Sequence, residues 1–97
     1  MIVQRMLVRS KPGGGRWREA ANLARAERER TGRPRRIYLN NIGPLNTIAM
    51  EFEFEDFKEM ETFWSEWTAT SESEAFLEKW YDLLEADGHD EVWTLVE

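Results

Sequence analysis

The sequence predicts an α+β fold of the ferredoxin-like βαββαβ type, with a four-stranded antiparallel sheet and a second helix that is split in two. The prediction depends first on residues 46–67, where the spacing of apolar residues changes from two to three or four, so that a half-buried strand leads directly into an amphipathic helix. It depends also on the order of the other segments, which place a strand and a helix before this stretch and a helix and a strand after it. Both helices of such a fold cover one face of the sheet, and the other face is left bare.

The N-terminal third is expected to hold one strand and one helix. Residues 2–9 alternate as a strand, and polar residues occur on both of its faces. The glycine-rich segment 10–15 is interpreted as a flexible connection, because its consecutive glycines match neither phosphate-binding loop pattern. Residues 16–31 are good helix formers with a stripe of mostly small apolar side chains, which predicts close packing on the sheet. Gly32 and Pro34 end this helix.

The middle of the chain is expected to form a hairpin followed by a helix. Residues 35–42 and 48–54 alternate as strands, and the turn at residues 43–46 is so short that they must pair antiparallel. The helix at residues 57–67 then carries apolar residues three and four apart. Asp56 is expected to cap its N-terminus.

The C-terminal part is expected to supply a further helix and the last strand. Ser71 and Glu74 have the spacing of a capping box, and the helix they begin is expected to end at Gly88. His89, the single histidine of the sequence, is expected to lie in a solvated loop. Residues 91–97 are predicted to form the fourth strand.

Size and composition limit the class of protein. A chain of 97 residues suits one domain, residues 1–97. The absence of cysteine excludes disulfides and thiolate metal sites. No apolar run approaches the ~20 residues that cross a bilayer, and the N-terminus lacks the apolar segment of a signal peptide. We therefore expect a cytoplasmic protein with no membrane association.

Charge is distributed unevenly along the chain. Residues 1–50 contain eleven Lys or Arg and three Asp or Glu, a net charge of +8, whereas residues 51–97 have a net charge of −14. One interpretation is a basic arm that binds nucleic acid. The favoured interpretation is that helices of opposite charge lie side by side and compensate within the domain, because so acidic a chain repels phosphate. We therefore expect no nucleic-acid binding.

Several segments resemble a known family. The first strand with Arg5, the turn at residues 11–13, the hairpin turn at residues 43–46 and the Trp-rich second helix are similar to NIPSNAP-type domains. These belong to the dimeric α+β barrel group, which also includes the antibiotic-biosynthesis monooxygenases. The resemblance covers nearly the whole chain. It implies a homodimer whose two sheets pack face to face, with a cavity between the sheet and the helices or within the barrel, and it implies no particular reaction.

The bare sheet face gives an independent reason to expect self-association. Strand alternation places there some of the apolar residues Val3, Leu7, Tyr38, Trp93 and Leu95. This is a large apolar surface for so small a domain. We expect a partner to cover it, and the simplest partner is a second copy of the chain.

The same face carries the candidate ligand site. By strand alternation it gathers polar and aromatic side chains, of which the candidate ligand-binding residues are Arg5, Tyr38, Asn40, Glu51 and Trp93, with Arg36 and Glu53 nearby. Charged groups that face an enclosed interior must find partners or mark a site. The favoured interpretation is a purely structural set of ion pairs across neighbouring strands or across the dimer. The alternative is a small-molecule pocket with Trp93 and Tyr38 as apolar walls.

The tryptophans of the helices also allow two interpretations. Trp17, Trp64, Trp67 and Trp80 lie on apolar helix stripes. The favoured interpretation is that they belong to the core, and the alternative is that they form the walls of a cavity for a planar aromatic ligand. Trp67 ends the longest stripe and is expected to pack on Phe52 or Phe54, so that Trp67→Ala would cost roughly 3 to 5 kcal/mol.

Most catalytic chemistries find no support in the sequence. A single histidine without cysteine makes a metal site improbable, and the segment at residues 73–86 lacks the histidine by which some related barrels hold haem. No GxSxG element is present, and the helix carboxylates fall on a polar, solvated face. We therefore expect no metal and no cofactor.

Three functions remain in competition. The first is a small-molecule binding protein. The second is a cofactor-independent monooxygenase or isomerase of the antibiotic-biosynthesis type, whose chemistry leaves almost no trace in a sequence. The third is a non-catalytic interaction module that uses the acidic helix face at residues 55–66.

Overall fold

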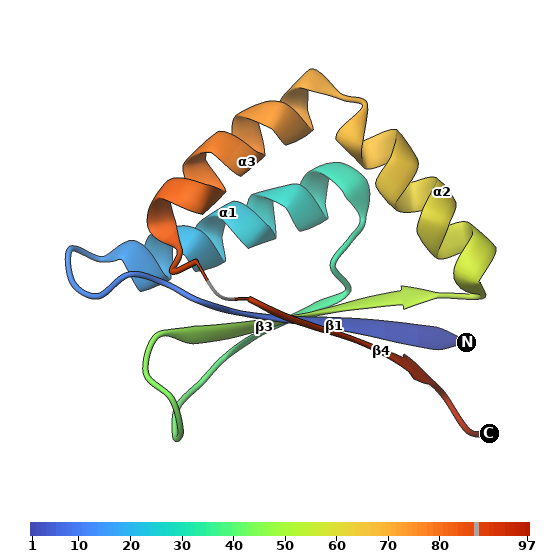
Figure 1. Cartoon of the computed structure of the whole chain (residues 1–97), viewed down its shortest axis with the longest axis horizontal. Coiled ribbons are helices and arrows are strands. Elements are labelled where there is room, and N and C mark those ends of the chain that lie inside the picture. The colour runs from blue at the N-terminus through green and yellow to red at the C-terminus, as the bar shows by residue number, and fades with distance from the viewer. Residues whose placement is uncertain (87) are drawn as a thin grey trace.

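The computed structural model describes residues 1–86 and 88–97, and in this part of the chain one four-stranded antiparallel sheet carries three helices (Figure 1). The elements are β1 (Ile2–Arg9), α1 (Arg16–Thr31), β2 (Arg36–Leu39), β3 (Thr47–Phe54), α2 (Phe57–Thr68), α3 (Ser71–Leu83) and β4 (His89–Thr94). The strand order is β2-β3-β1-β4, and every pair is antiparallel. The predicted α+β fold with a four-stranded antiparallel sheet is confirmed.

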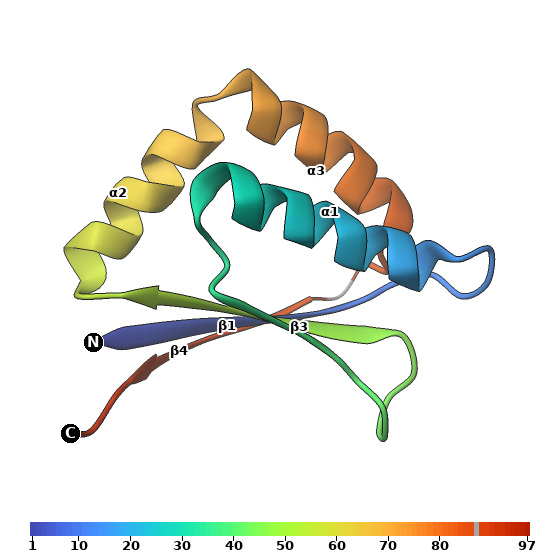
Figure 2. The same cartoon turned by 180° about the vertical axis from the view of Figure 1, so that it is seen from behind.

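All the helices lie on one side of the sheet. Figures 1 and 2 show α2 and α3 as the two arms of an arch that rises from the end of β3 and descends toward the start of β4. The arms meet at an elbow formed by Ala69 and Thr70. Helix α1 packs against α3 and β3 beneath this arch. The sheet face opposite the helices, called the bare face below, is covered by no element of the described chain.

Strand register decides which side chains face the helices. In β1, one of the two inner strands, Arg5 pairs with Glu51 of β3 and Glu91 of β4, and all three side chains are on the bare face. The next residue, Met6, is opposite Met50 and faces the helices. This alternation follows from the period of two in strands.

The core lies between the sheet and α1. Its buried apolar residues are Ile2, Ile48, Met50, Phe52 and Phe54 from the sheet, Ala20, Ala21 and Ala24 from α1, and Trp80, Leu83 and Leu84 from the end of α3. The small side chains of α1 allow its backbone to approach the sheet closely, as the sequence predicts. The core is therefore concentrated near α1 and the C-terminal half of α3.

Helix caps agree with the sequence in one case and differ in another. Asp56 caps α2 as predicted, because its Oδ1 accepts a hydrogen bond of 2.8 Å from the backbone N–H of Glu59. The predicted cap of the last helix at Ser71 is wrong by one residue. Thr70 is the cap, and its Oγ1 accepts from the backbone N–H of Ser73. A hydroxyl in either position suits a capping box, so composition alone does not distinguish them.

The C-terminal elements begin and end earlier than predicted. Helix α3 ends at Leu83 and not at Gly88, because Leu84 is extended and bridges to Ser10 at the end of β1. Strand β4 covers residues 89–94 in place of 91–97, so the prediction that His89 lies in a loop is wrong. His89 pairs with Leu7 of β1. The strand thus follows the length of its partner β1 and not its own apolar pattern.

Strand β2 is shorter than its predicted extent of residues 35–42. It comprises Arg36–Leu39, because the chain turns into the hairpin once Asn40 has donated its backbone N–H to Thr47. No helix of the described residues is long and apolar enough to cross a membrane.

Charge compensation between the two halves of the chain occurs mainly on the sheet and not between the helices. Helices α1 and α3 do pack together, but the ion pair that joins them in the described chain is Arg30–Glu72, at 4.0 Å. On the sheet, Arg5 pairs with Glu51 at 2.5 Å and Arg36 with Glu53 at 2.6 Å. The outer faces of the helices are therefore less compensated than expected.

Candidate functional site

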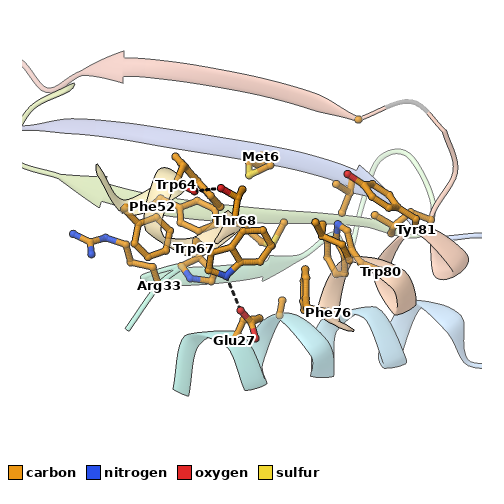
Figure 3. A pocket seen from close by; sticks show the side chains of 18 of the residues that line it. Met6, Glu27, Arg33, Phe52, Trp64, Trp67, Thr68, Phe76, Trp80 and Tyr81 are labelled. Carbon is orange, nitrogen blue, oxygen red and sulfur yellow. Dashed lines mark hydrogen bonds between the residues drawn. The ribbon is translucent and has the colours of Figure 1, made fainter. Parts of the chain in front are cut away.

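A cavity of about 820 Å³ lies between the arch and the helix-covered face of the sheet (Figure 3). It is lined by Met6 of β1 and Met50 of β3 on the sheet side and by Ala24 of α1, Trp64 of α2 and Trp80 of α3 on the helix side. Ligand pockets in proteins typically measure ~300 to 1,000 Å³ and are mostly apolar with a few polar groups. By volume and by lining, this cavity belongs to that class.

Aromatic side chains from both arms of the arch form its walls. They are Phe63, Trp64 and Trp67 of α2 and Phe76, Trp80 and Tyr81 of α3, joined by Phe52 of β3. Ring centroids are 5.6 Å apart for Trp64 and Trp67, 5.7 Å for Trp67 and Phe76, and 5.1 Å for Phe76 and Trp80. These separations are within the range of favourable aromatic contacts. The aromatic surface is therefore continuous across the elbow.

Helix α2 contacts the sheet through two of its aromatic residues. Phe63 contacts Phe54 at 5.7 Å and Trp64 contacts Phe52 at 5.0 Å, both measured between ring centroids. Trp67, one turn later, faces the cavity and contacts neither Phe52 nor Phe54 by ring stacking, so its predicted packing partners are wrong. No residue of α2 is fully buried. The helix forms a wall of the cavity and not a part of the closed core.

A carboxylate from α1 holds the Trp67 wall in place. The Trp67 Nε1 donates a hydrogen bond of 2.8 Å to Glu27 Oε2, while Arg30 donates to both Glu27 oxygens at 2.7 and 3.0 Å. The Glu27 side chain is only 13% exposed. Burial alone would raise its pKa, but the hydrogen bonds from Arg30 and Trp67 outweigh burial and lower the pKa below its ordinary value. Glu27 is thus an ionised group in the lining of a mostly apolar cavity.

The remaining polar groups lie toward the ends of the cavity. At one end the Arg33 guanidinium stacks over Phe54 at 4.5 Å and donates to Glu59, so it is already engaged. At the other end are Lys11 and the exposed side chains of Tyr81 and Glu85. Between them the polar groups of the lining are Glu27 and Thr68, whose hydroxyl donates to the Trp64 carbonyl at 3.0 Å.

A buried glutamine ties α2 to the sheet beside the cavity. Trp64 Nε1 donates a hydrogen bond of 2.7 Å to Gln4 Oε1, and Gln4 Nε2 donates to the Asp90 carboxylate at 3.2 and 3.3 Å. Gln4 is 6% exposed. These hydrogen bonds explain why a glutamine occurs among apolar neighbours in the sequence, because a buried amide must find partners.

The structure brings three of the five predicted ligand-binding residues together on the bare face. The Glu51 carboxylate accepts from Arg5 Nε at 3.2 Å, from the Arg5 terminal nitrogen at 2.5 Å and from the Tyr38 hydroxyl at 3.0 Å. The hydrogen bond from Arg5 is the main cause that lowers the pKa of Glu51, and the hydrogen bond to Glu51 raises the pKa of Tyr38. The ion pairs expected across neighbouring strands are therefore present, and a role of this cluster in ligand binding stays a prediction.

The other two predicted residues are placed differently. Trp93 is on the bare face of β4, where its Nε1 donates to Glu91 at 3.0 Å. Glu91 also contacts His89, whose hydrogen bond is the main cause of the lowered pKa of Glu91. Asn40 lies at the hairpin, and its side chain donates to the Pro44 carbonyl at 3.1 Å, which stabilises the turn. Asn40 is thus a turn residue and is separate from the Arg5 cluster.

The cavity lies on the opposite side of the sheet from the predicted site residues. Its signal in the sequence was the aromatic stripe of the helices, for which walls of an aromatic-binding cavity were the less favoured interpretation. Trp64 and Trp67 are half-buried and line the cavity, whereas Trp80 is buried and contributes to both the cavity and the core. Glu27, whose spacing predicts only a solvated helix position, is the functional candidate that the sequence did not indicate. Among the described residues no group of His, Cys, Asp or Glu is arranged to hold a metal ion.

Comparison with known proteins agrees with this architecture. No family model matches the sequence, and neither does any curated protein. A NIPSNAP family protein from Agrobacterium tumefaciens strain C58 is similar in structure, with a TM-score of 0.83, 18% identity, and coverage of 99% of this chain and 93% of that chain. An uncharacterized NIPSNAP domain protein from Burkholderia xenovorans gives a TM-score of 0.82, 18% identity, and coverage of 99% and 95%.

The likeness extends to a second group of proteins with the same fold. An antibiotic biosynthesis monooxygenase gives a TM-score of 0.74 at 15% identity, and each chain is covered over 100% of its length. The resemblance inferred from the sequence is thereby confirmed: the structural neighbours are NIPSNAP proteins and antibiotic-biosynthesis-monooxygenase-like proteins. At these identities the likeness concerns the fold, and no specific function follows from it.

Proposed function

We propose that the chain binds a small, flat and largely apolar molecule in the cavity between the arch and the sheet. The observation that carries the proposal is the cavity itself, a space of about 820 Å³ with aromatic walls in a domain of 97 residues. A concave space of this size with mostly aromatic and aliphatic walls is typical of small-molecule pockets.

The walls favour a planar aromatic ligand over a branched aliphatic one. Trp67, Phe76 and Trp80 present adjoining ring surfaces, two of them stacked at an angle of 27°. Rings offset against such surfaces gain about 0.5 to 1.5 kcal/mol for each pair beyond the burial of their area. On the sheet side, Met6 extends into the cavity (Figure 3), and its flexible thioether adapts to different ring shapes.

The test is a binding measurement with a matched pair of variants. Bicyclic and tricyclic aromatic compounds are titrated against the wild type by calorimetry, and binding is expected in the micromolar range or tighter. Met6→Trp fills the cavity from its floor and should reduce affinity at least ten-fold. Ala75→Phe adds an aromatic ring on the exposed face of α3 and should leave affinity unchanged. Equal affinity of the Met6→Trp variant and the wild type would locate binding elsewhere.

A second candidate is a cofactor-independent monooxygenase or isomerase. The observation in its favour is the whole-chain structural likeness to an antibiotic biosynthesis monooxygenase, combined with an aromatic cavity in this chain. An electron-rich phenol held in the cavity would be the substrate. The test is incubation of a bound phenol with the protein in air, without added flavin or metal, followed by mass spectrometry. Oxidation by O2 without a reductant takes two hydrogen atoms from the phenol, so that it becomes a quinone with one added oxygen atom while the second oxygen atom leaves as water. Such a quinone, or an isomerised product, that is absent with Met6→Trp would establish turnover.

We propose in addition that two copies associate through the bare face. Tyr38, Trp93 and Leu95 are 47%, 58% and 48% exposed there, a large apolar area for a free surface. The hairpin between β2 and β3 and the C-terminus both bend to this side of the sheet (Figures 1 and 2). Sedimentation at low micromolar concentration tests this proposal, and a mass of 11.5 kDa would contradict it.

Two expectations from composition also stay proposals. A cytoplasmic location is supported by the lack of cysteine and is tested by fractionation of the source cells. Absence of nucleic-acid binding is supported by the net charge of −6 and is tested by titration with single- and double-stranded DNA at two salt concentrations.

A further inference from the structure

We infer that Glu27 is a ligand-binding residue that accepts a hydrogen bond from the ligand, so that the molecule bound in the cavity is a neutral aromatic compound carrying an O–H or aromatic N–H donor. The inference rests on the proposed function and specifies its ligand class. It selects phenols and indole-like compounds, and it excludes aromatic carboxylates.

The first argument is position. Glu27 lies on α1 and lines the cavity below the Trp67 indole, beside Phe76, as Figure 3 shows. A ring that stacks on these aromatic side chains brings its substituents near the carboxylate. Glu85 is the other carboxylate in the described lining, and it is exposed at the end of the cavity. Glu27 is therefore the acidic group that a buried ligand meets.

The second argument is unused hydrogen-bonding capacity. A carboxylate has about four acceptor positions on its two oxygens. In the described chain, Arg30 occupies one position on Oε1 and one on Oε2, and Trp67 occupies the second position on Oε2. One position on Oε1 is left for a further donor. A buried charged acceptor with spare capacity gains from such a donor more than a neutral acceptor does.

The third argument is charge. The hydrogen bonds from Arg30 and Trp67 favour the ionised form of Glu27 despite its burial, so the group acts as an acceptor only. Arg30 already compensates this charge at 2.7 Å. A ligand carboxylate placed beside it would add a second negative charge in an apolar site and would be repelled. The site thus discriminates between a phenol and a benzoate-like anion of similar shape.

The experiment compares three probes of the same ring system: 2-naphthol, its methyl ether and 2-naphthoate. Affinities are measured by calorimetry at pH 7 with the wild-type protein. Naphthol should bind at least about ten-fold more tightly than the ether, which is the ratio expected of a hydrogen bond to a charged acceptor. Apolar contact alone would favour the larger ether. Naphthoate should bind more weakly than naphthol.

Two variants separate the role of the carboxylate from its structural role. Glu27→Leu should still bind the ether, and the ratio of naphthol to ether affinity should fall to about one. Trp67→Phe removes the same Trp67–Glu27 hydrogen bond but keeps the carboxylate, so the ratio should persist. If circular dichroism shows that Glu27→Leu is unfolded, Glu27→Gln is used in its place. The loss of charge in Glu27→Gln should still lower the ratio of naphthol to ether affinity.

The failures are distinguishable. Binding of none of the three probes to the wild type would overturn the proposed function together with this inference. Equal binding of naphthol and ether would leave the binding cavity in place and overturn the role of Glu27. Tightest binding of naphthoate would show that a cationic group and not Glu27 selects the ligand, and it would also overturn the inference.

Discussion

The Trp67–Glu27 hydrogen bond gives a sharp test of how the cavity wall is held. Trp67→Phe keeps an aromatic ring against Trp64 and Phe76 but removes the indole N–H that donates to Glu27 at 2.8 Å. Trp67→Ala removes the hydrogen bond and the ring together. The difference between the two variants therefore separates the polar from the apolar contribution of one side chain.

The magnitudes follow from the contacts. A hydrogen bond to a charged group contributes about 1.5 to 3 kcal/mol, and the lower part of this range applies here, because Glu27 keeps both hydrogen bonds from Arg30 in the variant. We expect Trp67→Phe to lower the free energy of unfolding by about 1.5 to 2 kcal/mol. Trp67→Ala should cost about 3 kcal/mol, near the lower end of the range for buried aromatics, because one side of the ring faces the cavity and not packed atoms.

Urea denaturation followed by far-ultraviolet circular dichroism measures both values. Tyr81→Phe is the control, since Tyr81 lines the same cavity but is 68% exposed, and its change should stay within about 0.5 kcal/mol. No loss in Trp67→Phe would mean that the hydrogen bond does not hold the wall. Equal losses of the free energy of unfolding in Trp67→Phe and Trp67→Ala would refute the claim that the aromatic ring of Trp67 stabilises the wall by apolar contact.

Asp56→Ala removes the side-chain acceptor of the Glu59 N–H and should lower the free energy of unfolding by about 0.5 to 2 kcal/mol in urea, whereas an unchanged midpoint would show that the cap does not stabilise α2. The pKa of Glu51 is lowered chiefly by Arg5, so its stabilising contribution is present above its ordinary pKa of 4.5 and is lost as the pH falls through the lower folded value. The thermal stability of the wild type should therefore fall below about pH 4.5, and that of Glu51→Gln should fall less. Identical pH profiles of the two melting temperatures would contradict this. The proposed association through the bare face predicts that Trp93→Asp lowers the sedimenting mass toward that of the 11.5 kDa monomer, and a mass unchanged from the wild type would contradict it.

Periodicity predicted most of the fold because each period has a single geometric meaning. The alternation from Ile48 to Phe54 identified a strand with one buried face, and all the alternate large residues of this stretch are indeed buried. The elements at residues 2–9 and 16–31 have the predicted bounds. The C-terminal elements were less predictable, because their ends depend on pairing with β1 and not on local sequence.

The candidate cavity was not predictable in the same way. An apolar stripe shows which side of a helix faces inward, but it does not show whether the space it faces is filled. Trp64 and Trp67 occupy equivalent stripe positions, yet Trp64 packs on Phe52 while Trp67 faces the cavity. The difference arises from tertiary packing, which places Trp64 over β3 and leaves Trp67 near the elbow, at the end of α2.

The bare-face cluster was predictable in its membership because side chains alternate between the two faces of a strand. Arg5, Tyr38 and Glu51 were placed on one face from strand alternation alone, and they are hydrogen-bonded to one another. Asn40 could not be separated from them, since the end of β2 depends on the hairpin hydrogen bonds and not on alternation.

The lack of any fully buried residue in α2 has a consequence for the rates at which its backbone amides exchange with solvent. Local opening of a helix costs little free energy when few of its contacts are buried, so α2 should lose its amide protons earlier than α1, whose inner residues Ala20 and Ala24 are buried against the sheet. A ligand held between Trp67 and Trp80 would be bound only while α2 is closed. Saturation with such a ligand should therefore slow deuterium uptake in α2 far more than in α1 or β1, and the slowing would report occupancy of the cavity without any assay of turnover.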